Sequence, residues 1–215
     1  MEWLSRIPLE WQALKLKYSC LLVRDGTHQP PPRTATGFPL LSVRNLVDGK
    51  LVNLPDDSLI SEEDFNKLER SFKVERNDVL LAIVGATLGK AALVEDMEPF
   101  AVQRSLAILR PNPKIVKYQF LLYFLQSRLF QSFLWSNVAF SAQPGIYLGA
   151  LANFWITTPP IDEQQRIIEV LDSATAKIDL SIKKMREAIE HLHEYRTALT
   201  SAAVTGKIDV RGKMQ

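Results

Sequence analysis

The chain has few residues that could build metal or thiol chemistry. Of its 215 residues, one is a cysteine and three are histidines. A single cysteine, Cys20, excludes an intramolecular disulfide and a cysteine-based zinc site, and its apolar surroundings favour a small buried residue over a reactive thiol. His191 and His193 are two positions apart and face different sides of a helix. We therefore expect no metal site and no catalytic residue in this chain.

Long apolar runs are also missing. The most apolar stretches, 120–124 and 130–135, are separated by Gln126, Ser127 and Arg128 and are too short to cross a bilayer. Residues 1–9 lack the apolar core and small-residue cleavage site of a signal peptide. The sequence predicts a cytoplasmic protein without a membrane partner.

Carboxylates are absent from one long part of the chain. The net charge is only +2, but residues 99–161 carry five basic side chains and no acidic one, whereas residues 54–98 carry five basic and eleven acidic ones. A segment without carboxylates suits a polyanion, because no like charge opposes phosphate there. The alternative is that an apolar core segment simply has few charges of either sign.

The first 161 residues predict an α+β domain of short strands and helices. Alternating or β-branched patterns indicate strands within 11–23, 38–52, 78–94 and 101–111, with a hairpin turn at Asp48-Gly49. Helical spacing indicates one short helix over 61–72, capped by Ser61, and another over about 117–135. Residues 138–160 return to loop and strand. Helices and strands do not alternate regularly, as they would in an α/β fold.

A single long helix is predicted over 162–205, followed by a tail over 206–215. Asp162 is the expected cap, with Gln165 as its capping-box partner. Apolar residues then recur at intervals of seven, with further apolar or small residues between them, as in a coiled coil. The expected contact residues are Leu171, Ala174, Ile178, Ile182, Met185, Ile189, Leu192, Tyr195 and Leu199.

This helix needs a partner that the chain does not contain. Some forty residues form a rod of roughly 60 Å, and no second helix in the chain has a matching length. The economical solution is a homodimer through antiparallel helices, with a globular domain at each end of the rod. The alternative is a single helix that lies across its own domain.

Several stretches together resemble one protein family. "FPLLSVRNLVDGKL", "NDVLLAIVGATLGKAALV", "FAVQRSLAIL" and the run "TTPPIDEQQRI" into the long helix, closing in "LTSAAVTGKID", occur in the order and spacing of the DNA-specificity (S) subunit of type I restriction-modification systems. The most specific pieces are the "GATLGK" turn and the double proline with its following Glu163 and Gln164. The resemblance covers nearly the whole chain.

The resemblance implies a target-recognition domain over 1–161 and a conserved spacer helix over 162–205. An S subunit reads double-stranded DNA, while separate subunits act as DNA adenine methyltransferase (M) and as restriction enzyme and translocase (R). It implies no cofactor here, because S-adenosylmethionine, ATP and Mg²⁺ belong to those partner subunits. A full S subunit has two recognition domains and two helices, whereas this chain has one of each. We expect a half-subunit or a fragment.

Polar side chains on the predicted turns are the candidates for DNA contacts, although each could instead be a solvated surface residue or a turn former. They are Arg24, Thr27, His28, Arg33, Arg44, Thr87, Lys90, Gln103, Arg104, Ser105, Ser141, Gln143 and Tyr147. Gln143 is the most specific of these candidates, because the following Pro-Gly turn would hold its amide in place for a bidentate contact to adenine.

Motifs for nucleotide or methyl-donor chemistry are incomplete. Only three residues separate Gly85 from Gly89 in "GATLGK", and Ala91 replaces the metal-binding hydroxyl of a Walker A loop. We therefore expect a non-enzymatic DNA-recognition subunit that dimerises, reads half of a bipartite target and directs separate methyltransferase and restriction subunits. The alternative is a coiled-coil scaffold or regulator whose globular domain binds another protein, with the acidic segment 54–98 as its surface. A stand-alone nuclease or methylase is a third and weaker option.

Overall fold

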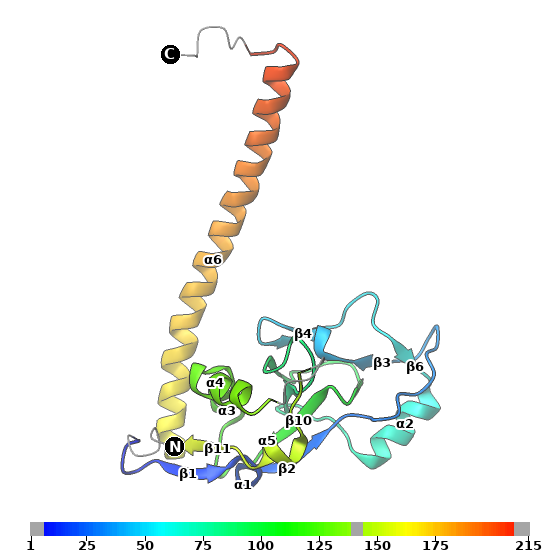
Figure 1. Cartoon of the computed structure of the whole chain (residues 1–215), viewed down its shortest axis with the longest axis vertical. Helices are drawn as coiled ribbons and strands as arrows, with labels where there is room; N and C mark the ends of the chain where they lie inside the picture. The colour runs from blue at the N-terminus through cyan, green and yellow to red at the C-terminus, as the bar shows by residue number, and fades with distance from the viewer. Residues whose placement is uncertain (1–6, 139–143, 209–215) are drawn as a thin grey trace. The chain divides into compact units, whose positions relative to one another are not determined.

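The computed structural model describes residues 7–138 and 144–208 (Figure 1). It contains two compact units, Met1–Ile168 and Glu169–Gln215. The first unit is a mixed α+β domain and the second consists mainly of one long helix, which confirms the predicted fold class. Within the described ranges, no helix is both long and apolar enough to cross a bilayer.

A six-stranded sheet forms the centre of the first unit. Its strand order is β2-β10-β7-β8-β5-β4, and all neighbours are antiparallel except β5 and β8. The bounds are β2 Cys20–Asp25, β10 Leu106–Pro111, β7 Val79–Ala82, β8 Ala91–Leu93, β5 Lys50–Leu51 and β4 Leu46–Val47. Every residue of β7 is buried, because apolar clusters cover both faces of the sheet at its centre.

Two smaller sheets complete the strands. β1 (Gln12–Lys15) pairs antiparallel with β11 (Trp155–Thr158), which joins the start of the domain to its end. β3 (Phe38–Leu41) lies between β6 (Leu59–Ile60) and β9 (Ala101–Val102). The short helix α2 (Glu62–Ser71) begins after Ser61, whose hydroxyl accepts a hydrogen bond from Asp64 N at 3.1 Å. The cap and the amphipathic helix predicted here are confirmed.

Three of the regions predicted as strand or loop differ in detail from the expectation. The strand predicted over 11–23 is divided into β1, the one-turn helix α1 (Leu16–Ser19) and β2. The stretch 38–52 contains a 3-10 turn η2 (Val43–Asn45) between β3 and the predicted Asp48-Gly49 hairpin. Residues 138–160 contain a further short helix, α5 (Leu148–Ala152), before β11.

The helix predicted over 117–135 is also divided. It forms α3 (Tyr118–Gln126) and α4 (Arg128–Ser136), separated by Ser127 in an extended conformation. Ser127 accepts a hydrogen bond from Phe130 N through its hydroxyl, at 3.2 Å, and so caps α4. The break lets Phe120 and Phe130 both enter the core cluster that covers one face of the central sheet.

The long helix α6 (Ile161–Val204) starts one residue before the predicted cap, so Asp162 lies in its first turn instead of preceding it. Gln164 is fully buried in the first unit. Its Oε1 accepts a hydrogen bond from Lys117 N at 2.8 Å, and its Nε2 donates to Ile115 O at 2.9 Å and Pro159 O at 2.8 Å. One side-chain amide therefore fixes the start of α6 to two loops of the domain.

Candidate nucleic-acid interface

Three turns meet at one end of the central sheet, and a fourth segment, 144–147, is hydrogen-bonded to one of them. β2 ends at Asp25, β10 begins at Leu106, β7 ends at Ala82 and β8 begins at Ala91, and these four strands are consecutive antiparallel neighbours. The turns that follow or precede them therefore lie at the same end of the sheet. We call this surface the loop end of the sheet; it consists of residues 26–28, 83–90, 103–105 and 144–147.

Backbone hydrogen bonds tie the first two of these turns together. Thr27 N donates to Val102 O at 3.0 Å, and Arg104 N donates to Thr27 O at 3.1 Å. Gly26 is required at this junction, because a Cβ atom there would lie 2.2 Å from Val102 O and 2.4 Å from Gln103 O. Residues that are more than seventy positions apart thus present their side chains from one rigid backbone.

The other two turns continue the same arrangement. Ile83 N donates to Ser105 O at 2.9 Å, Ile146 N donates to Ile83 O at 2.9 Å, and Gly85 N donates to Pro144 O at 2.7 Å. These bonds extend the sheet pairing beyond the ends of the strands. The backbone of the loop end is therefore fixed by tertiary structure, as a recognition surface requires.

Eight of the predicted DNA-contact residues belong to the loop end. They are Thr27, His28, Thr87, Lys90, Gln103, Arg104, Ser105 and Tyr147. Among them Tyr147 is an exposed aromatic residue, with 84% of its surface accessible. Thr87 faces the protein instead, since its Oγ1 is buried and has no hydrogen-bond partner among the described residues.

Three predicted contact residues lie elsewhere. Arg24 has its guanidinium carbon 4.1 Å from the centre of the Phe72 ring and donates to Ser71 at the end of α2. Arg44 forms ion pairs with Asp56 and Asp57, which raise the pKa of the guanidinium.

Arg33 donates to Pro31 O at 3.4 Å within its own loop, and no described contact links it to the loop end. Two further candidates, Ser141 and Gln143, lie outside the described residues.

The cations of the loop end differ in how far they are neutralised. Arg104 and Lys90 are exposed, and neither forms an ion pair within the described ranges. The His28 imidazole lies 2.6 Å from the Asp25 carboxylate, so its charge when protonated is locally compensated. Arg104 and Lys90 are therefore the side chains of this surface that are best placed to neutralise a phosphate.

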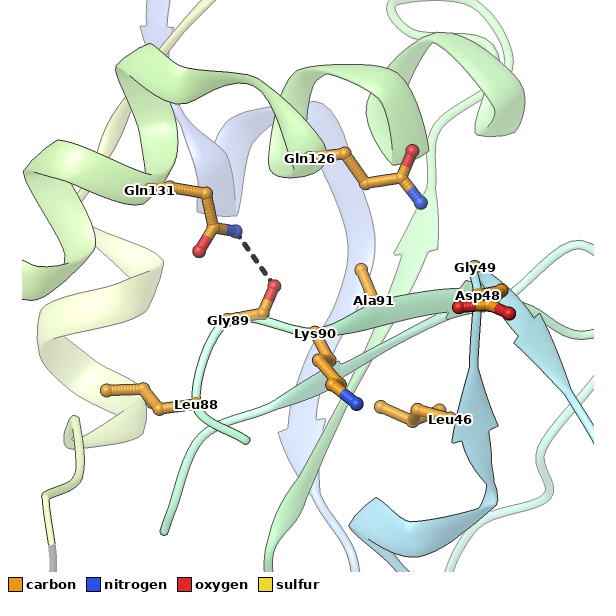
Figure 2. A pocket seen from close by; sticks show the side chains of 9 residues that line it. All are labelled: Leu46, Asp48, Gly49, Leu88, Gly89, Lys90, Ala91, Gln126 and Gln131. Atoms are coloured by element: carbon orange, nitrogen blue, oxygen red, sulfur yellow. Dashed lines mark hydrogen bonds between the residues drawn. The ribbon is translucent and has the colours of Figure 1, made fainter. Parts of the chain in front are cut away.

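A cavity of about 290 Å³ adjoins Lys90 (Figure 2). It is lined by Leu46, Asp48, Gly49, Leu88, Gly89, Lys90, Ala91, Gln126 and Gln131. Figure 2 shows the Gln131 side chain of α4 above the turn, and its Nε2 donates to Gly89 O at 2.8 Å and to Leu125 O at 2.7 Å. A side chain at Gly89 would meet Gln131 Oε1 at 2.3 Å, and Gly89 has a positive φ of 89°. Gln131 thus fixes the turn that carries Lys90.

Sequence reasoning did not single out Gln131 as a positioning residue. Its signal is a polar residue close to the buried face of an apolar helix, between Phe130 and Leu134. That pattern indicates a buried amide with a fixed partner, but the partner, a glycine 42 positions earlier, follows only from the tertiary structure.

The second unit carries an exposed apolar surface. Residues Ile178, Met185 and Leu192 of α6 are 57%, 65% and 66% exposed, although they are apolar and recur every seven residues. By helical spacing, the seam of α6 consists of Leu171, Ile178, Met185, Leu192 and Leu199 together with Thr175, Ile182, Ile189 and Arg196. Ala174 and Tyr195, which were also predicted as contact residues, flank this seam on one side. An exposed stripe of this length is typical of a surface that binds another helix.

Comparison with known proteins identifies related chains. Residues 39–191 match the family model described as the type I restriction modification DNA specificity domain. The chain is 27% identical over 190 residues to the type I restriction enzyme EcoBI specificity subunit of Escherichia coli, which covers 88% of this chain and 40% of that protein. It is 27% identical over 213 residues to the type I restriction enzyme MjaVIII specificity subunit of Methanocaldococcus jannaschii. That match covers 97% of this chain and 48% of that protein.

Solved structures show the same fold. One is a chain from a structure described as the structural basis underlying complex assembly and conformational transition of the type I R-M system. Its TM-score to this chain is 0.69 at 22% identity, and the match covers 92% of this chain and 46% of that one. Another is the HsdS subunit from Thermoanaerobacter tengcongensis, with a TM-score of 0.57 at 20% identity over 80% and 39%. The chain spans less than half the length of each of these relatives.

Proposed function

Because the chain belongs to the family of type I restriction modification DNA specificity domains, we propose that it reads double-stranded DNA through the loop end of its central sheet. Residues 1–161 act as the target-recognition domain and residues 162–205 as the spacer and dimerisation helix. The chain itself catalyses no reaction and holds no cofactor or metal. S-adenosylmethionine, ATP and Mg²⁺ act in the methyltransferase and restriction subunits that it directs.

One observation carries the DNA-binding proposal. Four segments from distant parts of the sequence are joined at one end of the sheet and present Arg104 and Lys90, which form no ion pair within the described ranges. The segment that supplies Arg104 and Tyr147 has no acidic residue between positions 99 and 161. Cations on such a surface bind phosphates, while Gln103, Ser105 and Tyr147 offer groups that contact base edges.

The spacer helix accounts for the second half of the function. A single recognition domain reads one arm of a target, whereas its family relatives are about twice as long. Two copies joined through the exposed seam of α6 would supply two recognition domains and restore that size. We propose that the homodimer reads a bipartite target, one arm per copy, and that the length of α6 sets the gap between the arms.

Salt-dependent binding tests the DNA-recognition proposal. Two unpaired cations per copy give four phosphate contacts per dimer, and each contributes about −0.9 to the slope of log K against log salt. We expect the affinity of the purified chain for a mixture of duplexes to fall roughly a hundredfold between 50 and 200 mM NaCl in a fluorescence anisotropy titration. Binding that is insensitive to salt, or no binding, would exclude the proposed interface. Binding of a protein partner through the acidic segment would then be the surviving alternative.

A further inference from the structure

The two sides of the α6 seam differ in character. One side carries, at intervals of seven, Ala174, Ser181, Ala188 and Tyr195, which we call the small row. The other side carries Asp172, Asp179, Arg186 and His193, which we call the charged row. The second row changes sign near the middle of the helix, from acidic to basic. Asp179 and Arg186 form no ion pair within the described part of the chain. Asp179 and Arg186 therefore offer charges to a partner.

The charged row favours one orientation of a second copy of the helix. In a parallel pair of helices, residues of the charged row would face the small row, and Arg196 in the seam would face Arg196 of the second copy. In an antiparallel pair, each row faces its own counterpart, and Arg196 faces Leu171 and approaches Asp172 of the second copy. Only the antiparallel arrangement brings the acidic half of the charged row opposite the basic half.

We infer that two copies pair antiparallel in one register, with the two-fold axis level with Lys183 and Lys184. Asp179 then lies opposite Arg186 of the second copy, and Asp172 lies opposite His193 of the second copy. This inference rests on the proposed dimer and specifies its interface.

The same register matches the apolar residues by size. Ile182 faces Met185 of the second copy, Ile178 faces Ile189, and the bulky Tyr195 faces the small Ala174. The charged row, however, distinguishes this register from the two registers that are shifted by one heptad. A shift of one heptad in one direction places Arg186 opposite Arg186, and a shift in the other direction places Asp179 opposite Asp179. Both shifts keep the apolar layers but bring like charges together near the two-fold axis.

Single cysteines in the small row report the register directly. Ser181 faces Ala188 of the second copy in the proposed register. We therefore expect a mixture of S181C and A188C chains to form a disulfide-linked dimer under mild oxidation, whereas each variant alone stays uncrosslinked. The unsubstituted chain is the control, because Cys20 is partly buried and its thiol has a pKa raised to about 12 by desolvation.

The outcomes separate the register from the dimer itself. Cross-linking of S181C alone, or of A188C alone, indicates one or the other shifted register. No cross-linking in either variant or in their mixture indicates a different arrangement, such as parallel helices, in which this row faces the charged row. Any of these results overturns the inference but leaves the dimer intact. A chain that sediments as a monomer at micromolar concentration instead rejects the proposed dimer, and with it the register.

Charge exchange provides an independent measurement. D179R and R186D each place like charges at two symmetric sites, and we expect each to raise the dissociation constant of its homodimer about tenfold or more in sedimentation equilibrium. The double variant D179R/R186D restores both pairs and should dimerise as the unsubstituted chain does. An equimolar mixture of the two single variants should form the heterodimer preferentially. Equal affinity in all four cases would overturn the register.

Discussion

Arginine side chains in the first unit have different roles, which depend on the groups that they contact. Arg110 donates to both oxygens of the buried Asp78, at 2.8 and 2.9 Å, and to Lys73 O at 2.7 Å, so it holds β10 against the start of β7. These contacts raise the pKa of the Arg110 guanidinium, chiefly through its hydrogen bonds to Asp78. Arg104 has no such partner among the described residues. The sequence alone does not distinguish Arg104 from Arg110. The fold shows that Arg110 is bound to Asp78 and that Arg104 faces solvent.

Removal of Arg104 should weaken DNA binding through phosphate contacts. The dimer of Arg104→Ala loses two cations, so we expect the slope of log K against log salt to become shallower by about 1.8. The matched control is Lys114→Ala, which removes an exposed cation from the same carboxylate-free segment at the opposite end of β10. Anisotropy titrations of both variants measure the two slopes. Equal losses in both variants would mean that net charge, and not the loop end, governs binding.

Tyr147 is expected to act on base preference instead of salt dependence. Its backbone is fixed, since Tyr147 O accepts hydrogen bonds from Ala150 N and Leu151 N. The residue is 84% exposed and follows Ile146, whose N donates to Ile83 O. A ring held in this way loses little conformational freedom when it contacts a base. Tyr147→Ala should reduce the preference among duplex sequences about tenfold while the salt slope stays unchanged. Tyr147→Phe should keep the preference if the ring, and not the hydroxyl, makes the contact. Unaltered preference in Tyr147→Ala would remove this residue from the recognition surface.

At the scale of elements, the sequence predicted some local features correctly but did not predict the long-range pairings. The cap at Ser61 and the Asp48-Gly49 hairpin are encoded within a few residues, and the structure has both. The break at Ser127 was missed because helical spacing of apolar residues continues across it. The approach of Thr27 to Gln103 follows from the order of strands in the sheet. No local pattern contains that order, so the sequence predicted the contact residues singly, without the geometry that joins eight of them.

The first turns of α6 depend on the Gln164 amide. Gln164→Leu would leave Lys117 N, Ile115 O and Pro159 O without their partner in a buried site. We expect a loss of roughly 3 kcal/mol in the free energy of unfolding, because each buried unsatisfied group costs about 1–3 kcal/mol and part of this is recovered by relaxation. Urea titrations followed by tryptophan fluorescence measure the change. The control Arg166→Gln alters an exposed residue half a turn away and should change the stability by less than about 0.5 kcal/mol. Similar values for both variants would show that the amide has no special role.

At the scale of the whole molecule, symmetry limits what the proposed dimer reads. Two identical recognition domains related by a two-fold axis present the same loop end to opposite strands of the duplex, so the two arms of the target must be inverted repeats. We expect repeated selection of bound duplexes from a random pool, with the dimer and its methyltransferase partner, to give an inverted repeat around an unread gap. A heterodimer of D179R and R186D chains, with Arg104→Ala in one chain only, should lose affinity at one arm and keep the other. Selection of an asymmetric target would contradict a two-fold dimer, because identical chains in equivalent positions cannot prefer different sequences.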